Sequence, residues 1–240
     1  MSEPRRVAVT GAASGIGAAT ARLLMARGWR VACLDRDIAG AERTAGDCGL
    51  AVEVDVADEA QVIWAFDKVA EAFGGLDALV TAAGVIETVP FLETTPDQFR
   101  RLFDINVIGS FLCVREGAKA MQAGARICML ASISSYTGGG YVATGAYAAS
   151  KGAVLTMMKS CARALGERGI AVNAVAPGFI DTPFVASAMN DPVRRPKVEA
   201  AVGRVGKPEQ IAETIAWLIS PEADFIHGET VIADGGVLMR

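Results

Sequence analysis

Short apolar runs alternate along the chain with longer segments in which apolar residues recur every three or four positions. The apolar runs, which predict strands, occupy residues 5–10, 29–34, 50–54, 78–81, 125–131, 171–176 and 229–233. The segment at 15–27 carries Ile16, Ala19 and Leu23 on one helical face. Further helices are predicted at 38–46, from Asp58 to Phe73, from Thr95 onward, and over 102–121, 146–165 and 208–219.

Strands that alternate with helices favour a parallel sheet covered by helices on both faces. The sequence therefore predicts an α/β protein with a doubly wound Rossmann fold, and residues 1–240 are expected to form one domain. Polar motifs follow several of the predicted strands directly. Because the carboxyl ends of parallel strands share one edge of the sheet, we expect these motifs to meet there.

The first strand and the first helix are joined by a glycine-rich turn. Gly11, Gly15 and Gly17 let the backbone bend sharply and come close to a diphosphate. The diphosphate would be met by backbone N–H groups and by the positive end of the helix dipole. The turn therefore indicates a dinucleotide site.

The second strand leads into Asp35 and Arg36. A carboxylate at this position accepts the hydroxyl groups of an adenosine ribose and repels a 2′-phosphate. Arg36 is the contrary sign, since an arginine pairs well with that phosphate. No basic residue stands among Ala12, Ala13 and Ser14 of the glycine turn, so NAD is predicted in preference to NADP.

Tyr147 and Lys151 stand four residues apart at the head of an alanine-rich helix. This spacing puts both side chains on one helical face. A cation beside a phenol favours the phenolate, which would draw the tyrosine pKa down from about 10. The pair therefore predicts an acid/base device that exchanges a proton with a substrate.

Composition and charge exclude several other classes of function. The net charge is −4, and acidic and basic residues are intermixed, which argues against nucleic-acid binding. Five scattered cysteines are expected to be small buried residues in a reducing compartment, and the single histidine, His227, leaves no ready histidine-based metal site. No apolar segment is long enough to span a membrane, so a cytoplasmic, soluble protein without bound metal is expected.

In order along the chain stand Thr10-Gly11-Ala12-Ala13-Ser14-Gly15-Ile16-Gly17, Asn106-Val107-Ile108-Gly109, a serine after the fifth strand, Tyr147-Ala148-Ala149-Ser150-Lys151 and Pro177-Gly178. Together these motifs resemble the short-chain dehydrogenase/reductase family, classical type, from Arg5 to Gly236. The resemblance implies an oxidoreductase that moves a hydride reversibly between NAD(H) and a secondary alcohol or ketone. One departure is Thr81-Ala82-Ala83-Gly84, where the family usually carries Asn-Asn-Ala-Gly, and the loss removes amides that would tie the strand end to its neighbour.

The resemblance also assigns roles to individual residues. Tyr147 is the general acid/base, Lys151 lowers its pKa and holds the nicotinamide ribose, and Asn106 kinks its helix and supports a proton relay through water. Ser134 lies 13 residues before Tyr147, the family's common interval, and is expected to orient the substrate oxygen, with Ser132 as the alternative. Cofactor contacts are implied at Gly11, Ser14, Gly15, Ile16, Gly17, Asp35, Arg36, Asp55, Val56, Ala82, Gly84, Tyr147, Lys151, Pro177, Gly178, Ile180 and Thr182.

The substrate pocket is expected to be mostly apolar and to suit a medium-sized hydrophobic or cyclic alcohol or ketone. Its predicted lining includes Ser134, Tyr141, Tyr147 and Val185, and residues 183–207 are expected to form a lid. Apolar residues on several faces of 102–121 and 146–165 predict a homo-oligomer, most simply a tetramer. A 3-oxoacyl carrier-protein reductase and a cofactor-binding regulator without catalysis are the alternatives.

Overall fold

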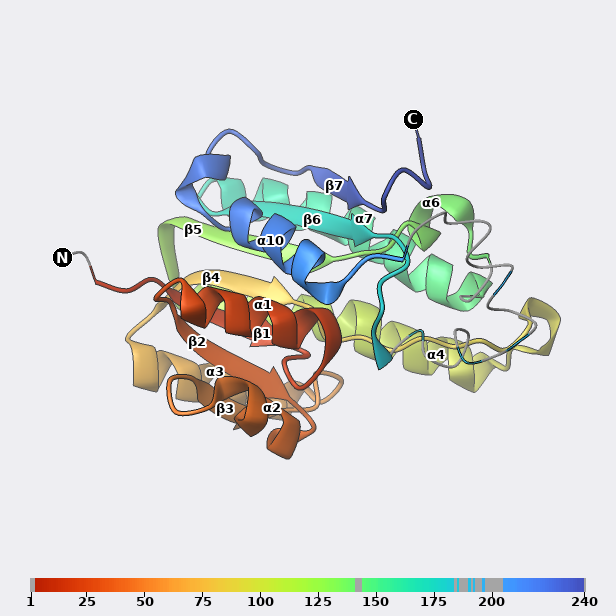
Figure 1. The fold of residues 1–240 in the computed structure, drawn as a ribbon. Coiled ribbons are helices and arrows are strands. Elements are labelled where there is room, and N and C mark those ends of the chain that lie inside the picture. The colour runs from red at the N-terminus through yellow and green to blue at the C-terminus, as the bar shows by residue number, and fades with distance from the viewer. Residues whose placement is uncertain are drawn as a thin grey trace.

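The computed structural model describes residues 3–140, 144–183, 185, 190, 192, 196 and 205–239. One parallel sheet of seven strands runs through the molecule in the order β3-β2-β1-β4-β5-β6-β7 (Figure 1). The strands are β1 (Arg6–Thr10), β2 (Arg30–Asp35), β3 (Leu50–Glu53), β4 (Leu76–Thr81), β5 (Met121–Leu130), β6 (Ala171–Pro177) and β7 (Thr230–Ala233). The predicted doubly wound α/β fold is confirmed.

Helices cover both faces of this sheet (Figure 1). On one face lie α1 (Gly15–Ala26), α2 (Ile38–Ala45) and α10 (Pro208–Leu218), and on the other lie α3 (Glu59–Phe73), α5 (Ser110–Lys119) and α7 (Gly145–Gly166). Successive residues of β1 divide between the two layers: Val7 and Val9 pack with the first set, and Ala8 packs with the second. This two-residue alternation explains why all three central residues of β1 are apolar.

Several helices begin at side chains that bond the first backbone N–H groups. The Asp37 carboxylate accepts from Gly40 N before α2, and Asp58 accepts from Ala60 N and Gln61 N before α3. Thr95 and Gln98 form a capping box at the start of α4 (Pro96–Phe103), where the sequence predicted a helix from Thr95 onward. Ser14 makes no such cap for α1, so the N-terminus of that helix is left open.

The long helix predicted over 102–121 consists of three parts. α4 runs into a π-helical turn, η2 (Asp104–Gly109), before α5 begins, and β5 already starts at Met121. Hydrophobic spacing cannot distinguish one wide turn within a helix, and it missed the short helices η1 (Phe91–Glu93), α6 (Ser134–Thr137) and η3 (Pro221–Ala223).

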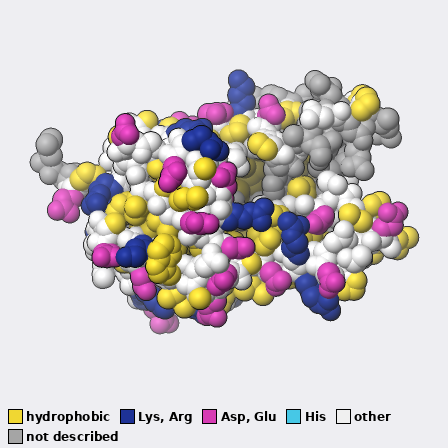
Figure 2. Space-filling model, turned by 90° about the horizontal axis from the view of Figure 1, so that it is seen from below, with side chains coloured by type: hydrophobic (Ala, Val, Ile, Leu, Met, Phe, Trp, Pro, Cys, Tyr) yellow, Lys and Arg dark blue, Asp and Glu magenta, His cyan; other side chains and the backbone are white. Residues whose placement is uncertain are grey.

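Surface charge, cysteine burial and helix hydrophobicity can each be compared with the expectations from the sequence. On the described part of the face in Figure 2, Lys and Arg side chains are interspersed with Asp and Glu and do not gather into one basic patch. Cys33, Cys113 and Cys128 are buried as expected, but Cys48 is exposed. Within the described part of the chain, no helix is both long and apolar enough to cross a membrane.

Candidate active site

The carboxyl ends of the strands open into one cavity of about 510 Å³. Every residue for which the sequence predicted cofactor contact lines this cavity. Those residues are Gly11, Ser14, Gly15, Ile16, Gly17, Asp35, Arg36, Asp55, Val56, Ala82, Gly84, Tyr147, Lys151, Pro177, Gly178, Ile180 and Thr182. Motifs spread over most of the chain therefore meet at one edge of the sheet.

The glycine turn packs too closely for side chains at two of its positions. Gly11 has a φ of 69°, and a Cβ there would lie 2.7 Å from the backbone nitrogen of Ala83. A Cβ on Gly17 would overlap the carbonyl oxygen of Gly11. The first turn of α1, Gly15 to Gly17, lines the cavity, and the Ser14 side chain caps none of its backbone N–H groups. The arrangement is a cradle for an anionic group.

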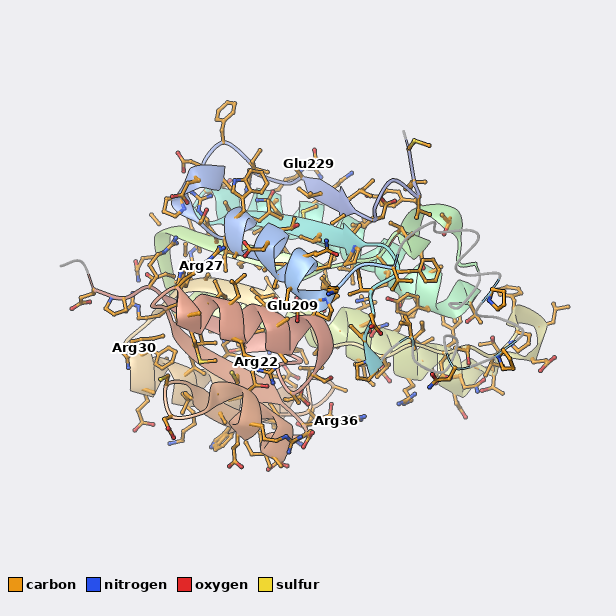
Figure 3. All side chains as sticks on the ribbon, in the orientation of Figure 1. Arg22, Arg27, Arg30, Arg36, Glu209 and Glu229 are labelled. Atoms are coloured by element: carbon orange, nitrogen blue, oxygen red, sulfur yellow. The ribbon has the colours of Figure 1, made fainter. Side chains whose placement is uncertain are left out.

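Asp35 ends β2 at the wall of the cavity. One carboxylate oxygen accepts from Ala13 N and the other from Asp37 N, both at 3.0 Å, which fixes the carboxylate beside the glycine turn. Arg36 is exposed at the rim, on the loop between β2 and α2 (Figure 3). Both charges that bear on cofactor choice therefore border the same cavity.

Tyr147 and Lys151 lie in the first turns of α7, and both are buried. The Lys151 amine is 6.0 Å from the centroid of the Tyr147 ring and donates to the carbonyl oxygen of Leu130 at 2.8 Å. Burial raises the pKa of the Tyr147 phenol, against the opposing effect of a hydrogen bond with Ser132, and burial lowers the pKa of Lys151 to about 8. The expected lowering of the phenol pKa is thus not present in the protein alone, because loss of water outweighs the hydrogen bond with Ser132.

Ser132 and Ser134, the two candidates after β5, differ in their contacts with Tyr147. Ser132 is buried, and its side chain is hydrogen-bonded to that of Tyr147. Ser134, which the 13-residue interval favoured, begins α6, and its backbone N–H donates to the Ser132 hydroxyl at 3.1 Å. Both line the cavity, but the geometry places Ser132 against the tyrosine. The 13-residue interval therefore favours a different serine from the one whose hydroxyl is bonded to the phenol.

Asn106 lies in the π-helical turn and is fully buried behind the cavity wall. Its amide accepts from Val85 N at 2.8 Å and donates to Val85 O and to the Ser150 hydroxyl, each at 3.0 Å. Its backbone carbonyl accepts the Ser110 hydroxyl at 2.8 Å. The amide side chain thus fixes the loop after β4 to the helix that carries Asn106.

Comparison with known proteins agrees with this geometry. A family model described as "Enoyl-(Acyl carrier protein) reductase", from the short-chain dehydrogenases, matches residues 11–238. The chain belongs to the short-chain dehydrogenase/reductase family.

Individual members of the family are similar over nearly the full length. Cis-4-hydroxycyclohexanecarboxylate dehydrogenase of Sinomonas cyclohexanicum is 41% identical, with 97% of this chain and 96% of the relative covered. Sorbitol dehydrogenase of Cereibacter sphaeroides is 35% identical, with 95% of each chain covered. The structure of a 3-ketoacyl-(acyl-carrier-protein) reductase from Brucella melitensis, complexed with NADH, has a TM-score of 0.88 at 32% identity and covers 99% of both chains.

The short-chain dehydrogenase signature departs at Thr81-Ala82, where amides were expected to tie β4 to its neighbour. In the structure, a residue of β1 connects the two strand ends, because the Thr10 hydroxyl accepts a hydrogen bond from Ala83 N at 3.2 Å. The Thr81 hydroxyl is buried without a hydrogen-bond partner in the described part of the chain. The missing amides therefore do not leave the end of β4 unattached.

The cavity lining includes a predicted substrate-pocket residue, Val185, and a residue that was not predicted, Val237. Val185 is buried and lines it as predicted, whereas Tyr141 and most of the predicted lid at 183–207 lie outside the described residues. Val237 also lines it, held by a turn in which the Asp234 carboxylate accepts from Gly236 N at 2.8 Å and from Leu238 N at 2.6 Å. The sequence Asp234-Gly235-Gly236 could have predicted this turn, because aspartate and glycine are typical turn residues.

Proposed function

We propose that this short-chain dehydrogenase/reductase uses NAD(H) to interconvert a ring-bearing secondary alcohol and the corresponding ketone. One observation carries the proposal: the buried side chain of Tyr147, hydrogen-bonded to Ser132, lies with Lys151 in the same cavity as the glycine turn. A phenol that lines the cavity suited to a dinucleotide supports this reaction, because a phenol can exchange a proton with the substrate oxygen.

The residues fit a dinucleotide on grounds independent of the family. The open N-terminus of α1 and the absence of room for side chains at Gly11 and Gly17 suit a diphosphate. Asp35 retains lone pairs beyond its two backbone bonds and can accept ribose hydroxyls, while its charge disfavours a 2′-phosphate. Arg36 lies exposed at the rim of the cavity, and no basic residue joins it from Ala12, Ala13 or Ser14 of the glycine turn, so we favour NAD over NADP.

The bound cofactor supplies the hydride acceptor or donor at its nicotinamide ring. In the oxidation direction, Tyr147 takes the proton of the substrate hydroxyl, and the Ser132 hydroxyl orients that oxygen. Tyr147 must be a phenolate before it takes this proton, and burial makes the phenolate costly, so the protonated Lys151 amine 6.0 Å from the ring stabilises it. Asn106 holds the cavity wall at Val85 and, by analogy with the family, supports proton exchange with solvent.

The described walls near these residues favour an apolar ring. Val85, Ile86, Ile133 and Val185 line this part of the cavity, and Lys151 and Arg36 are the basic residues among its described lining. A cyclohexanol derivative suits this environment, as the similarity to a hydroxycyclohexanecarboxylate dehydrogenase also suggests. A 3-oxoacyl thioester is the second candidate, favoured by the likeness to the Brucella melitensis reductase.

The direct test is a spectrophotometric assay with cyclohexanols, open-chain polyols and a 3-oxoacyl thioester, each with NAD(H) and NADP(H). Tyr147→Phe should lower kcat at least about 10²-fold and leave NADH affinity within a few fold, because the phenol acts in the chemical step. Ser132→Ala should reduce kcat far more than the matched variant Ser134→Ala. A Tyr147→Phe enzyme with near-normal kcat would show that the proton passes elsewhere and refute the proposal.

A further inference from the structure

Ser150 precedes Lys151 on α7 and is completely buried, yet it is given no part in the chemistry proposed above. Its hydroxyl donates to the carbonyl oxygen of Tyr147 at 2.7 Å and accepts from the Asn106 amide at 3.0 Å. A hydroxyl has one proton, so donation to Tyr147 leaves the lone pairs of Ser150 for Asn106. The direction of both hydrogen bonds is therefore fixed: Asn106 donates to Ser150, and Ser150 donates to Tyr147.

The Asn106 amide is the other half of this connection. It binds both the N–H and the carbonyl of Val85, and the remaining amide hydrogen goes to Ser150. Val85 lines the cavity, and Tyr147 stands in the first turn of α7. Through Ser150, the amide therefore joins the wall after β4 to the helix that carries the tyrosine.

A buried serine or threonine in a helix is usually satisfied within that helix, because its hydroxyl donates to a backbone carbonyl one turn earlier. Thr20 on α1 shows this ordinary arrangement: it is buried, and its hydroxyl donates to Ile16 O at 2.7 Å within its own helix. Ser150 differs because it also accepts a bond from a residue 44 positions away in sequence. That second bond links two separate elements.

We propose that Ser150 is a positioning residue, which holds the Tyr147 end of α7 at a set distance from the Val85 wall by pairing with Asn106. The inference rests on the proposed function. Without the hydroxyl, a buried N–H of Asn106 loses its partner, and the amide or the helix must move to satisfy it. Displacement of a reacting group by about 1 Å can slow an enzymic reaction about 10²-fold.

The test compares Ser150→Ala with Thr20→Val, a matched variant that removes a buried helical hydroxyl without breaking a link between elements. Ser150→Ala should lower kcat between about 5-fold and 10²-fold and leave the KM for NAD within about threefold, because the loss falls on geometry at the reacting atoms. Thr20→Val should keep kcat within about twofold of wild type. The thiol of Ser150→Cys is similar in size to the hydroxyl and forms weaker hydrogen bonds, so the kcat of this variant should lie between those of wild type and Ser150→Ala. Ser150→Cys replaces the alanine variant in the test if the alanine variant does not fold.

A double-mutant cycle decides whether Ser150 acts through the amide. Asn106→Ala and the double variant Asn106→Ala/Ser150→Ala should have the same kcat, because the hydroxyl has nothing to transmit once the amide is gone. Multiplying effects in the double variant, or a Ser150→Ala enzyme with wild-type kcat, would overturn the inference and leave the proposed function standing. A wild-type enzyme without turnover on any substrate would remove the proposed function, and this inference with it.

Discussion

The buried amine of Lys151 allows the electrostatics of the site to be measured through protein stability. The side chain is 4% exposed, and burial lowers its pKa to about 8 from an ordinary 10.5. The two values differ by about 2.5, and each pKa unit corresponds to 1.36 kcal/mol, so the folded protein holds the charged amine at pH 7 at a cost of about 3 kcal/mol. Lys151→Met, which keeps the length and removes the charge, tests this cost.

The sign of the pH dependence follows from the lowered pKa. Between pH 8 and 10.5 the unfolded chain binds the lysine proton and the folded protein does not, so the free energy of unfolding of the wild type rises with pH through that window. Loss of the bond to Leu130 O offsets about 1 kcal/mol of the gain. At pH 7 the Lys151→Met variant should therefore be more stable than wild type by about 2 kcal/mol, and near pH 10 the advantage should disappear.

The measurement is urea unfolding without cofactor at pH 7, 8.5 and 10, followed by tryptophan fluorescence. Lys159→Met on the same helix is the control: Lys159 is exposed, so its removal should change stability by less than about 0.5 kcal/mol at every pH. The Lys151→Met protein should also be inactive, which would show a stability cost retained for catalysis. A destabilised Lys151→Met variant at pH 7, or a difference from wild type that stays constant between pH 7 and 10, would refute the reasoning.

Three further predictions concern the cofactor and the assembly. Asp35→Ala should weaken NADH binding about tenfold to 10²-fold and reduce the preference over NADPH, measured by fluorescence titration, and tighter binding of NADPH by the wild type would contradict the assignment. Gly17→Ala should lower NADH affinity at least about tenfold because its Cβ meets Gly11 O, whereas Gly152→Ala, with open space around it, should bind normally. We expect a homotetramer, because the apolar side chains of Ile108 in η2 and Phe111 in α5 are exposed, and light scattering that shows a monomer at micromolar concentration would contradict it.

Local pattern alone was sufficient for the fold and for the position of the site. The alternation of short apolar runs with helical spacing predicted the parallel sheet, because the central strands β1, β2, β4, β5 and β6 are buried on both faces and the helices on one. Once the sheet is parallel, its strand ends share an edge, so the glycine turn, Asp35 and the turn at Pro177 had to meet. The spacing of Tyr147 and Lys151 likewise depends on helix geometry alone.

Only the tertiary structure decided features that depend on contacts between distant segments. Counting residues favoured Ser134, but Ser132 is the serine whose hydroxyl is bonded to Tyr147. A neighbouring cation suggested a lowered phenol pKa, but burial by residues remote in sequence raises it. The pairing of Asn106 with Ser150 and the place of Val237 in the cavity wall arise in the same way, since neither periodicity nor spacing records which side chains the folded chain brings together.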